Sequence, residues 1–428
     1  MDRLRSSLRT SLFRNSFFLL LTSALGNSLG FLFWLAVARS YPDAVVGLAG
    51  AVYGVVLFLA GAGTLGLTYG VIRYLPTEAD RAGLVNAAIL ASAIGSAVLG
   101  LAFLAGLDLW APALVVLRTD ASLAAVCLLS IVGFAVAMVL DTAFVASRRA
   151  DYGTARAVIF GAVRLPIPVL VAGPFGFLGI LLAWTAGLAV SLAYGASLLR
   201  RIVPNLRPRL RLDAIRGRGI VGYSLWNHAA AIVAGVPMSL LPLMILNASK
   251  PEGGPEANAY FFAAAAIAGV LYVVPGAFTT SLFVEGSHPE ASYGQDVRHT
   301  VGFSLALLAL GILAAVVLGR WVLGFFGEAY ALEGYAPLVF LALASPAVLA
   351  NHVFVTHLRV DKRVRPIFVI TTVSSAVTLA LAFALLPVWG IAGAAGAYLL
   401  GQGIAAPLFA IERRRNGGQG VAETASRT

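Results

Sequence analysis

The sequence predicts an all-α polytopic membrane protein with about 12 transmembrane helices in two pseudo-symmetric six-helix lobes. Three observations lead to this fold class: the composition, the length of the apolar segments and an internal repeat. Of the 428 residues, 60% are hydrophobic and 11% are charged, and the mean hydropathy is +0.90. Soluble globular domains are much more polar than this.

The apolar residues form continuous segments of about 20, the length at which a helix crosses a hydrocarbon core of about 30 Å. Continuous apolar runs exclude the alternating pattern of a membrane β-barrel, and backbone groups in lipid must be hydrogen-bonded within helices. We therefore predict helical spans near residues 13–38, 46–72, 84–107, 121–145, 157–173, 176–199, 219–246, 259–284, 300–318, 335–356, 366–386 and 390–411.

The basic residues are distributed unevenly between the connections of these spans. With the N-terminus inside, the inner segments hold 25 of the 30 lysines and arginines and the outer loops hold four. This asymmetry predicts a multi-pass protein of the cytoplasmic (inner) membrane with both termini cytoplasmic. The net charge of +11 is therefore a topology signal. It does not indicate nucleic-acid binding, because no aromatic stacking residues interleave the seven arginines of 200–218.

The two halves of the sequence resemble each other at a nearly constant shift. Segment 42–76 aligns with 255–289 without a gap, and segment 176–187 aligns with 390–401. Because each half holds six spans, both halves run in the same direction, as in parallel repeats of transporters. Two such lobes suggest a cavity between them that opens to one side of the membrane at a time.

The repeat also predicts the domain organisation. We expect a six-helix lobe over 1–200, a basic cytoplasmic linker over 201–218, a second six-helix lobe over 219–411 and a disordered cytoplasmic tail over 412–428.

No motif of an enzyme is present. "GAGTLG" (61–66) matches the dinucleotide-binding pattern, but it lies within a predicted membrane helix, where small residues favour close helix packing. Walker A, G-x-S-x-G and H-E-x-x-H sequences are absent, and the five histidines are scattered. The single cysteine, Cys127, excludes an intramolecular disulfide. These features predict a transporter without a metal or other cofactor.

Several predicted spans carry a polar face. The first span has Ser23, Asn27 and Gly30 on one stripe, the seventh has Ser224 and His228 on one face with Asn227 adjacent in sequence, and the tenth has His352. Such residues either hydrogen-bond between helices or line an aqueous cavity. Their occurrence on the first helix of both lobes favours the cavity, so the candidate substrate-binding residues include Asn27, Asn227, His228 and His352.

Arg164 lies within the fifth predicted span, in "FGAVRLPIPVLVAG" (160–173). A charge at this depth is unfavourable by several kcal/mol unless it is paired or hydrated, and Pro166 and Pro168 predict a kink beside it. Two interpretations stay open. Arg164 forms an ion pair with Asp141 of the preceding helix, or it binds an anionic substrate group, which a guanidinium holds bidentately.

Two further charges lie near the inner ends of the second helix of each lobe. The repeat aligns Arg73 and Glu285 within one residue of each other. They are either interfacial anchors or parts of a cytoplasmic gate in which Arg73 meets a substrate headgroup. Asp141 and Glu285 are the titratable candidates for coupling to protons, sodium or the membrane potential.

The segment "RNSFFLLLTSALGNSLGFLFWLAVARSYPDAVVGLAGAVYGVVLFLAGAGTLGLTYGVIRYLP" (14–76) resembles the opening of polysaccharide-biosynthesis flippases. These belong to the multidrug/oligosaccharidyl-lipid/polysaccharide (MOP) exporter superfamily. "VVPGAFTTSLFVEGSHPE" (273–290) resembles their eighth helix and following loop. The resemblance implies a MOP- or MATE-like fold and transport by alternating access. It also implies cavity arginines that hold a diphosphate, and Arg164 is a candidate for such an arginine by its position.

What the resemblance implies about function is translocation of polyprenyl-diphosphate-linked oligosaccharides, or a related anionic glycolipid, for surface polysaccharide or glycan assembly. The partners would be this lipid-linked sugar, membrane lipids and other polysaccharide-assembly proteins. One alternative is a cation-coupled multidrug or toxin exporter of the same superfamily, which would need acidic residues deep in the first lobe. Another is an integral-membrane polysaccharide polymerase or ligase, which usually needs a larger outer loop than any in this sequence.

Overall fold

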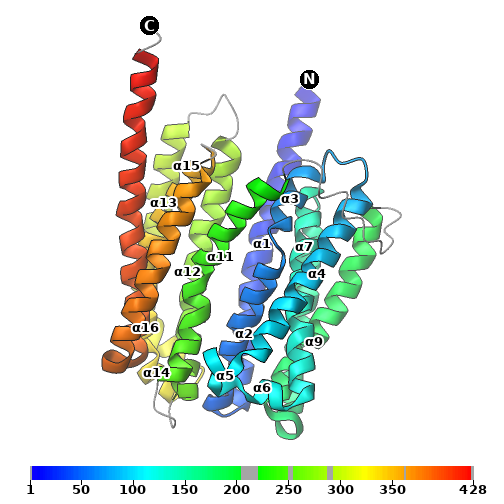
Figure 1. The fold of residues 1–428 in the computed structure, drawn as a ribbon, viewed down its shortest axis with the longest axis vertical. Helices are drawn as coiled ribbons and strands as arrows, with labels where there is room; N and C mark the ends of the chain where they lie inside the picture. Colours follow the sequence, from blue (N-terminus) through cyan, green and yellow to red (C-terminus); the bar gives the residue numbers. More distant parts are fainter. Residues whose placement is uncertain (1, 204–219, 249–253, 287–292, 361–362, 426–428) are drawn as a thin grey trace. The chain divides into compact units, whose positions relative to one another are not determined.

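The computed structural model describes residues 2–203, 220–248, 254–286, 293–360 and 363–425. Within these ranges the structure is all-helical, without a strand, which confirms the predicted fold class (Figure 1). Eleven helical segments among them are long and apolar enough to cross a membrane. The last of these, Val364–Glu412, has 49 residues, about twice the length that a bilayer requires. It contains both the eleventh and the twelfth predicted span.

The chain divides into two compact units. Unit 1 comprises Met1–His228 with Gly253–Ala259, and unit 2 comprises Ala229–Glu252 with Tyr260–Thr428. The helices of unit 1 are α1 (Asp2–Ser40), α2 (Asp43–Gly63), α3 (Leu67–Tyr74), α4 (Arg81–Ala105), α5 (Leu107–Trp110), the 3-10 helix η1 (Pro112–Leu114), α6 (Val116–Thr119), α7 (Ala121–Ala146), α8 (Ala150–Arg164) and α9 (Ile167–Ile202). Two helices, α11 (Ile220–Ala248) and α12 (Gly254–Gly286), have residues in both units. Unit 2 also holds α13 (Tyr293–Gly324), α14 (Glu328–Glu333), α15 (Tyr335–Val360) and α16 (Val364–Ala425).

Aspartate side chains define where two spans of unit 1 begin. Asp80 accepts a hydrogen bond from the backbone nitrogen of Gly83 at 2.8 Å and caps α4. Asp120 accepts one from Ser122 at 2.8 Å and caps α7. Each such cap stabilises a helix by about 1 kcal/mol, because it satisfies a backbone donor that the helix itself leaves free.

The "GAGTLG" segment ends a helix, whereas the sequence predicts that it continues one. Helix α2 stops at Gly63, and both Leu65 (φ 52°) and Gly66 (φ 75°) are left-handed before α3 begins at Leu67. Close packing is nevertheless present, since a Cβ on Gly63 would collide with the backbone of Ser96 in α4. The glycines serve both purposes, because a residue without a Cβ tolerates positive φ and close helix approach alike.

In unit 2, hydrogen bonds from side chains to other spans connect the helices. Ser374 donates to the carbonyl of Gly401 at 2.8 Å, and Ser375 donates to that of Val233 at 2.8 Å. The amide of Asn351 in α15 donates to the Oε1 atom of Gln402 at 2.9 Å. Such bonds hold membrane helices together where no hydrophobic effect acts between them. At its end α16 continues as a helix to Ala425, whereas the sequence predicts a disordered tail. Extending an existing helix avoids the unfavourable nucleation step.

Two glycines that the internal repeat aligns adopt the same unusual backbone conformation. Gly176 (φ 46°, ψ −129°) interrupts α9, and Gly390 (φ 56°, ψ −143°) interrupts α16. Each is the first residue of the sixth predicted span of its half of the sequence. L-residues with a side chain rarely adopt these angles, so glycine allows the chain to reverse direction there almost without a loop.

Replacing Gly390 by alanine is expected to lower the free energy of unfolding by about 1–3 kcal/mol, because the Cβ is strained at positive φ. The matched control is Gly396→Ala. Gly396 is helical, and a Cβ there would have no heavy atom within 4 Å in the described part of the chain. The control should be neutral or slightly stabilising. Thermal unfolding of the detergent-purified variants measures both, and equal melting temperatures would contradict the strain.

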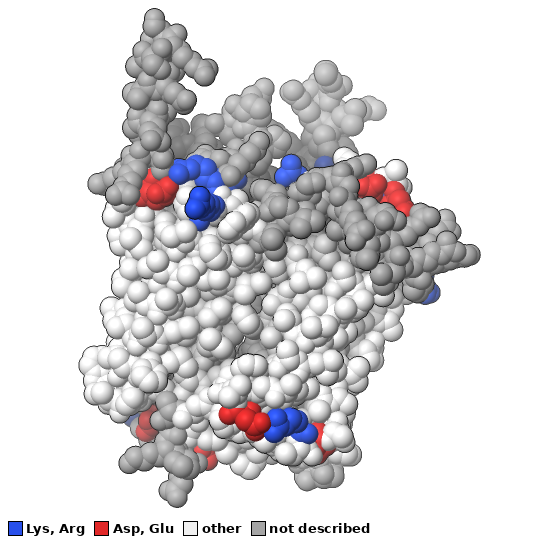
Figure 2. All heavy atoms as spheres, viewed as in Figure 1, with Lys and Arg blue, Asp and Glu red and all other residues white. Residues whose placement is uncertain are grey.

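Charged side chains lie towards the ends of the helices. On the face drawn in Figure 2, the lysines, arginines, aspartates and glutamates of the described residues gather at the two ends, and other residue types form the surface between them. The hydrocarbon core of a bilayer requires this arrangement, because an unpaired charge in it is unfavourable. The chain is accordingly a multi-pass membrane protein. The buried charged residues Arg156 and Arg164, inside unit 1, are exceptions to this pattern.

Candidate functional site

The fifth predicted span is broken immediately after Arg164. Helix α8 ends at Arg164 and α9 begins at Ile167, while Leu165 and Pro166 keep right-handed helical angles, so the helical hydrogen-bond pattern is interrupted where Pro166 and Pro168 predict a kink. The carbonyl of Pro168 accepts a hydrogen bond from the Tyr41 hydroxyl at 3.0 Å. Tyr41 lies between α1 and α2, and its burial raises the pKa of this hydroxyl, so it stays protonated and able to donate. This bond connects the start of α9 to the residue that follows α1.

The Arg164 side chain is enclosed by aromatic rings. Only 4% of the residue is exposed. Its guanidinium carbon lies 4.8 Å from the ring centroid of Phe33 and 4.4 Å from that of Phe160. These two rings belong to an aromatic cluster in which α1, α2, α7, α8 and α9 meet. The cluster consists of Phe33, Trp34, Tyr53, Phe134, Phe160 and Trp184.

The guanidinium lacks hydrogen-bond acceptors. Within the described part of the chain, neither the Nε nor the Nη1 atom of Arg164 has a partner, and both atoms are buried. Trp184 Nε1, in the same cluster, is also buried without a partner there. A desolvated cation–π contact is worth about 2 kcal/mol, whereas each unsatisfied buried donor costs about 1–3 kcal/mol, and more when charged. The rings therefore compensate the burial of Arg164 only in part.

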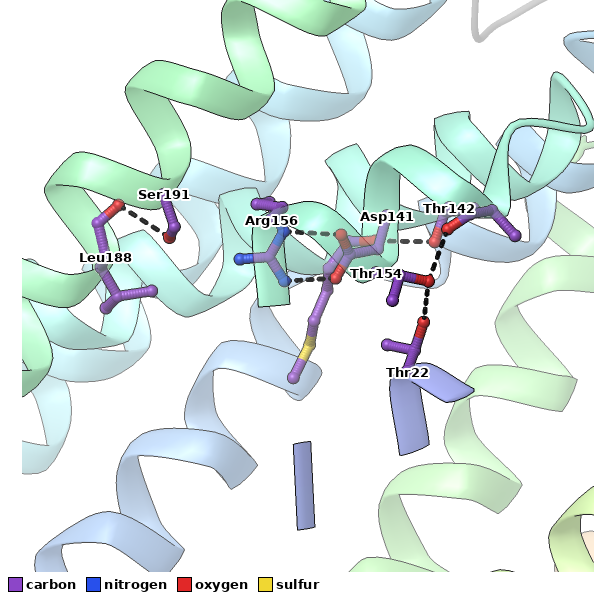
Figure 3. Close-up of polar contacts among 9 residues, drawn as sticks. Thr22, Asp141, Thr142, Thr154, Arg156, Leu188 and Ser191 are labelled. Carbon is purple, nitrogen blue, oxygen red and sulfur yellow. Dashed lines mark hydrogen bonds and ion pairs between the residues drawn. The ribbon is translucent and has the colours of Figure 1, made fainter. Parts of the chain in front are cut away.

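Of the two interpretations of Arg164, the ion pair with Asp141 is not the one the structure shows, because Arg156 binds Asp141. Arg156 donates from Nε to Oδ1 of Asp141 at 2.6 Å and from Nη2 to Oδ2 at 2.5 Å (Figure 3). This is the bidentate geometry that guanidinium and carboxylate prefer. Arg156 and Arg164 are the two charged residues classed as buried in the described part of the chain, so one has a counter-ion and the other has none.

Helix boundaries explain why Arg156 is the partner. Asp141 is five residues from the end of α7, and Arg156 is six residues after the start of α8. At 1.5 Å per residue both lie about 8–9 Å along their helices, whereas Arg164 lies about 21 Å along. The predicted fifth span begins near residue 157, whereas α8 already begins at Ala150, so Arg164 lies further along its helix than the predicted span implies. Arg164 is too far from Asp141 for a direct bond.

Glycines bring α1 against α8 at the height of Arg164. A Cβ on Gly161 of α8 would lie 2.5 Å from a Leu29 methyl of α1, so the missing side chain permits the close approach. A Cβ on Gly30 would meet one described atom within 4 Å, Nη2 of Arg164 at 3.5 Å. On the other side, a Cβ on Gly187 of α9 would lie 3.2 Å from the Cβ of Arg164. Gly30, the last residue of the polar stripe on the first span, thus lies next to the Arg164 guanidinium.

The other candidate residues lie in different surroundings. Asn27 is exposed on α1 and donates to the carbonyl of Ser23 at 2.7 Å. His228 is buried, and its Nε2 lies 3.0 Å from the carbonyl of Ala62 at the end of α2, to which it donates. Asn227 beside it is 2% exposed. Arg73 is exposed, and its guanidinium lies 5.6 Å from the Tyr74 ring centroid.

Two candidates lie outside unit 1 or outside the described side chains. His352 belongs to α15 of unit 2, where its side chain is exposed while the neighbouring Asn351 bonds to Gln402. Glu285 falls within the bounds of α12, and its side chain is outside the described residues. The structure therefore brings together Arg164 and Gly30 of the polar stripe, and none of the other candidates joins them in unit 1.

Sequence reasoning missed Arg156 and the two rings that enclose Arg164. Asp141 and Arg156 lie at similar distances from the turn that joins α7 to α8. This would have identified Arg156 as the partner of Asp141 if the start of α8 had been known. Phe160 is four residues before Arg164 on the same helix face, and that spacing was available in the sequence. Phe33 comes from a different helix, so no local pattern could have found it.

Similar solved structures are transporters. A multidrug resistance MATE family transporter of the MOP superfamily in its inward-facing conformation has a TM-score of 0.68 and 14% sequence identity, over 93% of this chain and 98% of that chain. Its outward-facing conformation has a TM-score of 0.67 and 17% identity, over 95% and 96%. The lipid II flippase MurJ in an inward closed conformation has a TM-score of 0.69 and 11% identity, over 94% and 87%.

The chain therefore has the MATE- and MurJ-like transporter fold over nearly its whole length. No family model and no curated protein matches the sequence. The likeness concerns the fold, and the substrate has to be argued from the residues of the site.

Proposed function

We propose that this protein is a flippase that moves a lipid-linked oligosaccharide, or a related anionic glycolipid, across the cytoplasmic membrane by alternating access. The observation that carries the proposal is the guanidinium of Arg164, which is buried among rings and whose Nε and Nη1 atoms have no hydrogen-bond partner among the described residues. Its missing partner is an oxyanion, since a guanidinium presents parallel N–H pairs that match phosphate oxygens. A polyprenyl diphosphate supplies such oxygens.

Arg156 supports this assignment as an internal comparison. Eight residues earlier on the same helix, it holds a carboxylate through Nε and Nη2. The same two-point geometry is open to an oxyanion at Arg164. The fold that the chain shares with a lipid II flippase is compatible with such a substrate. Surface polysaccharide or glycan assembly is the proposed role, with other assembly proteins as partners and both termini in the cytoplasm.

A second candidate function is a cation-coupled multidrug exporter, and the fold likeness to MATE transporters favours it. An organic cation or a coupling ion would need a free carboxylate within the membrane. In unit 1 the candidate is Asp141, and Arg156 already occupies both of its oxygens. Coupling to protons, sodium or the membrane potential through Asp141 or Glu285 therefore remains a secondary proposal.

Reconstitution distinguishes the two functions. The purified protein is placed in liposomes with an undecaprenyl-diphosphate-linked sugar, and the fraction of this lipid reached by a membrane-impermeant sugar-modifying enzyme is followed over time. We expect transfer between leaflets faster than in protein-free liposomes. In parallel liposomes, a fluorescent cationic dye is offered with a sodium or proton gradient. Gradient-driven dye transport without lipid transfer would establish the exporter and reject the flippase.

A further inference from the structure

Gly30 occupies an unusual place in unit 1. A side chain at this position would point at the guanidinium of Arg164, and Nη2 is the described atom that a Cβ there would meet within 4 Å. One helical turn earlier, a Cβ on Gly26 would meet nothing within 4 Å in the described part of the chain. Asn27 and Ser28, which lie between these two glycines in the sequence, are exposed. We call this stretch of α1, Gly26 to Gly30, the Gly30 opening.

In the described part of unit 1, aromatic rings and α9 border the Arg164 side chain on the sides away from Gly30. Phe33 and Phe160 cover its faces, and Gly187 of α9 adjoins the base of the Arg164 side chain. Phe33, 0% exposed, and Trp34, 5% exposed, continue α1 beyond Gly30 as part of the aromatic cluster. The Gly30 side is therefore a route by which an anion could reach Nη2 of Arg164 without displacing these rings.

The atom nearest the opening is also the one that matters for binding an oxyanion. Nη2 contributes to both edges of the guanidinium that can bind bidentately, the edge shared with Nε and the edge shared with Nη1. Arg156 uses the pair of Nε and Nη2 to hold Asp141. Contact at Nη2 would consequently give an incoming oxyanion access to the unpartnered Nε or Nη1 beside it.

We propose that Gly30 is a specificity-determining residue, which keeps open the passage by which a phosphate-type oxyanion of the transported lipid reaches Arg164. This rests on the proposed function, in which Arg164 binds that group. An alanine leaves the passage narrowed, because its Cβ stands at ordinary contact distance, 3.5 Å, from Nη2. A leucine closes it. The size of the side chain at position 30, rather than its polarity, decides whether an oxyanion can reach the Arg164 guanidinium.

Cysteine labelling tests the opening independently of transport. The only native cysteine, Cys127, is buried and is replaced by alanine, and Gly30→Cys is introduced in the full-length chain in membranes. Labelling rates are compared for a negatively charged sulfonatoethyl methanethiosulfonate and its positively charged trimethylammonium counterpart. Relative to a free thiol, we expect the anionic reagent to be favoured about tenfold, as a neighbouring unit charge implies. Arg164→Gln should abolish this preference.

Gly26→Cys in the same background is the matched control. It lies about 6 Å further along the helix, so it should be labelled with a smaller preference for the anion. A Gly30 cysteine that is unreactive while the Gly26 cysteine reacts would overturn the proposal. So would a preference at residue 30 that persists in Arg164→Gln, because another charge would then be its source.

A transport experiment separates this inference from the proposed function. In the lipid-transfer assay, Gly30→Leu should lower the rate as much as loss of Arg164 does, Gly30→Ala should lower it less, and Gly26→Leu should retain at least about half. If Arg164 variants lose transfer but Gly30→Leu does not, the passage is rejected and the flippase stands. If Arg164 variants transfer lipid normally, the binding role of Arg164 is rejected together with the passage.

Discussion

Replacing Arg164 by methionine is expected to reduce lipid transfer about 100-fold while leaving the protein as stable as before or more so. The variant loses two charge-assisted hydrogen bonds to the substrate, each worth about 1.5–3 kcal/mol, and a tenfold change in rate corresponds to about 1.4 kcal/mol. Methionine is shorter than arginine, but it is unbranched and apolar, so its flexible side chain can lie against the rings of Phe33 and Phe160. It removes the buried N–H groups that have no acceptor in the described structure.

The opposite signs of the two effects make this prediction informative. A buried charge that serves only the fold would, when removed, destabilise the protein by about 3–5 kcal/mol, because its partner would be left unpaired. Arg164→Lys is the matched control, since it keeps the charge but loses the bidentate geometry, and it should retain part of the activity. Transfer in reconstituted liposomes and thermal unfolding in detergent measure the two quantities. A marked loss of stability in the methionine variant would mean that Arg164 has a structural partner.

Loss of Asp141 is expected to have the largest effect on stability. Asp141→Ala leaves the guanidinium of Arg156, whose side chain is 9% exposed, without its carboxylate. Breaking a fully buried pair costs about 3–5 kcal/mol, and because the Asp141 side chain is 38% exposed we expect a smaller loss here, about 2–3 kcal/mol. The aliphatic part of Arg156 packs close to Gly195 of α9, where a Cβ would lie 3.2 Å from its Cδ, so the side chain has little freedom to move away. Thermal unfolding in detergent and the yield of monodisperse protein report the loss.

A double variant separates the structural role of this pair from a role in coupling. Asp141→Leu with Arg156→Met removes both charges and keeps the volume, and it should recover most of the stability, since apolar replacements of buried pairs are often neutral or stabilising. If lipid transfer also recovers, the pair serves the fold. Transfer that is lost in a stable double variant would instead support Asp141 as a coupling residue. Failure of the double variant to regain stability would contradict the pairing itself.

Much of the architecture could be predicted because lipid makes strict demands on a chain. Backbone groups without water must be hydrogen-bonded within helices, so apolar length alone identified the spans. The repeat then aligned Gly176 with Gly390, and both have the same left-handed conformation. The interruption after Arg164 followed from the geometry of proline. In each of these cases the cause lies within a few residues of its effect.

The break at "GAGTLG" shows where local reasoning fails. Small residues in a membrane helix are compatible with close packing and with a helix end. Gly63 packs on Ser96 of α4, and the helix is interrupted at Leu65 and Gly66. The spacing of residues in the sequence does not predict this interruption.

By itself the sequence determined the class of protein, the positions of the spans and the presence of a charge in the fifth span with prolines beside it. Each of these depends on composition and on neighbours along the chain. Which partner Asp141 has, which rings enclose Arg164 and which side of the guanidinium stays open were decided by the tertiary structure. These depend on where α7 ends, where α8 begins and how closely α1 approaches at Gly161. A shift of a few residues along a helix exchanges one partner for another, because each residue advances the helix by about 1.5 Å and turns it by about 100°.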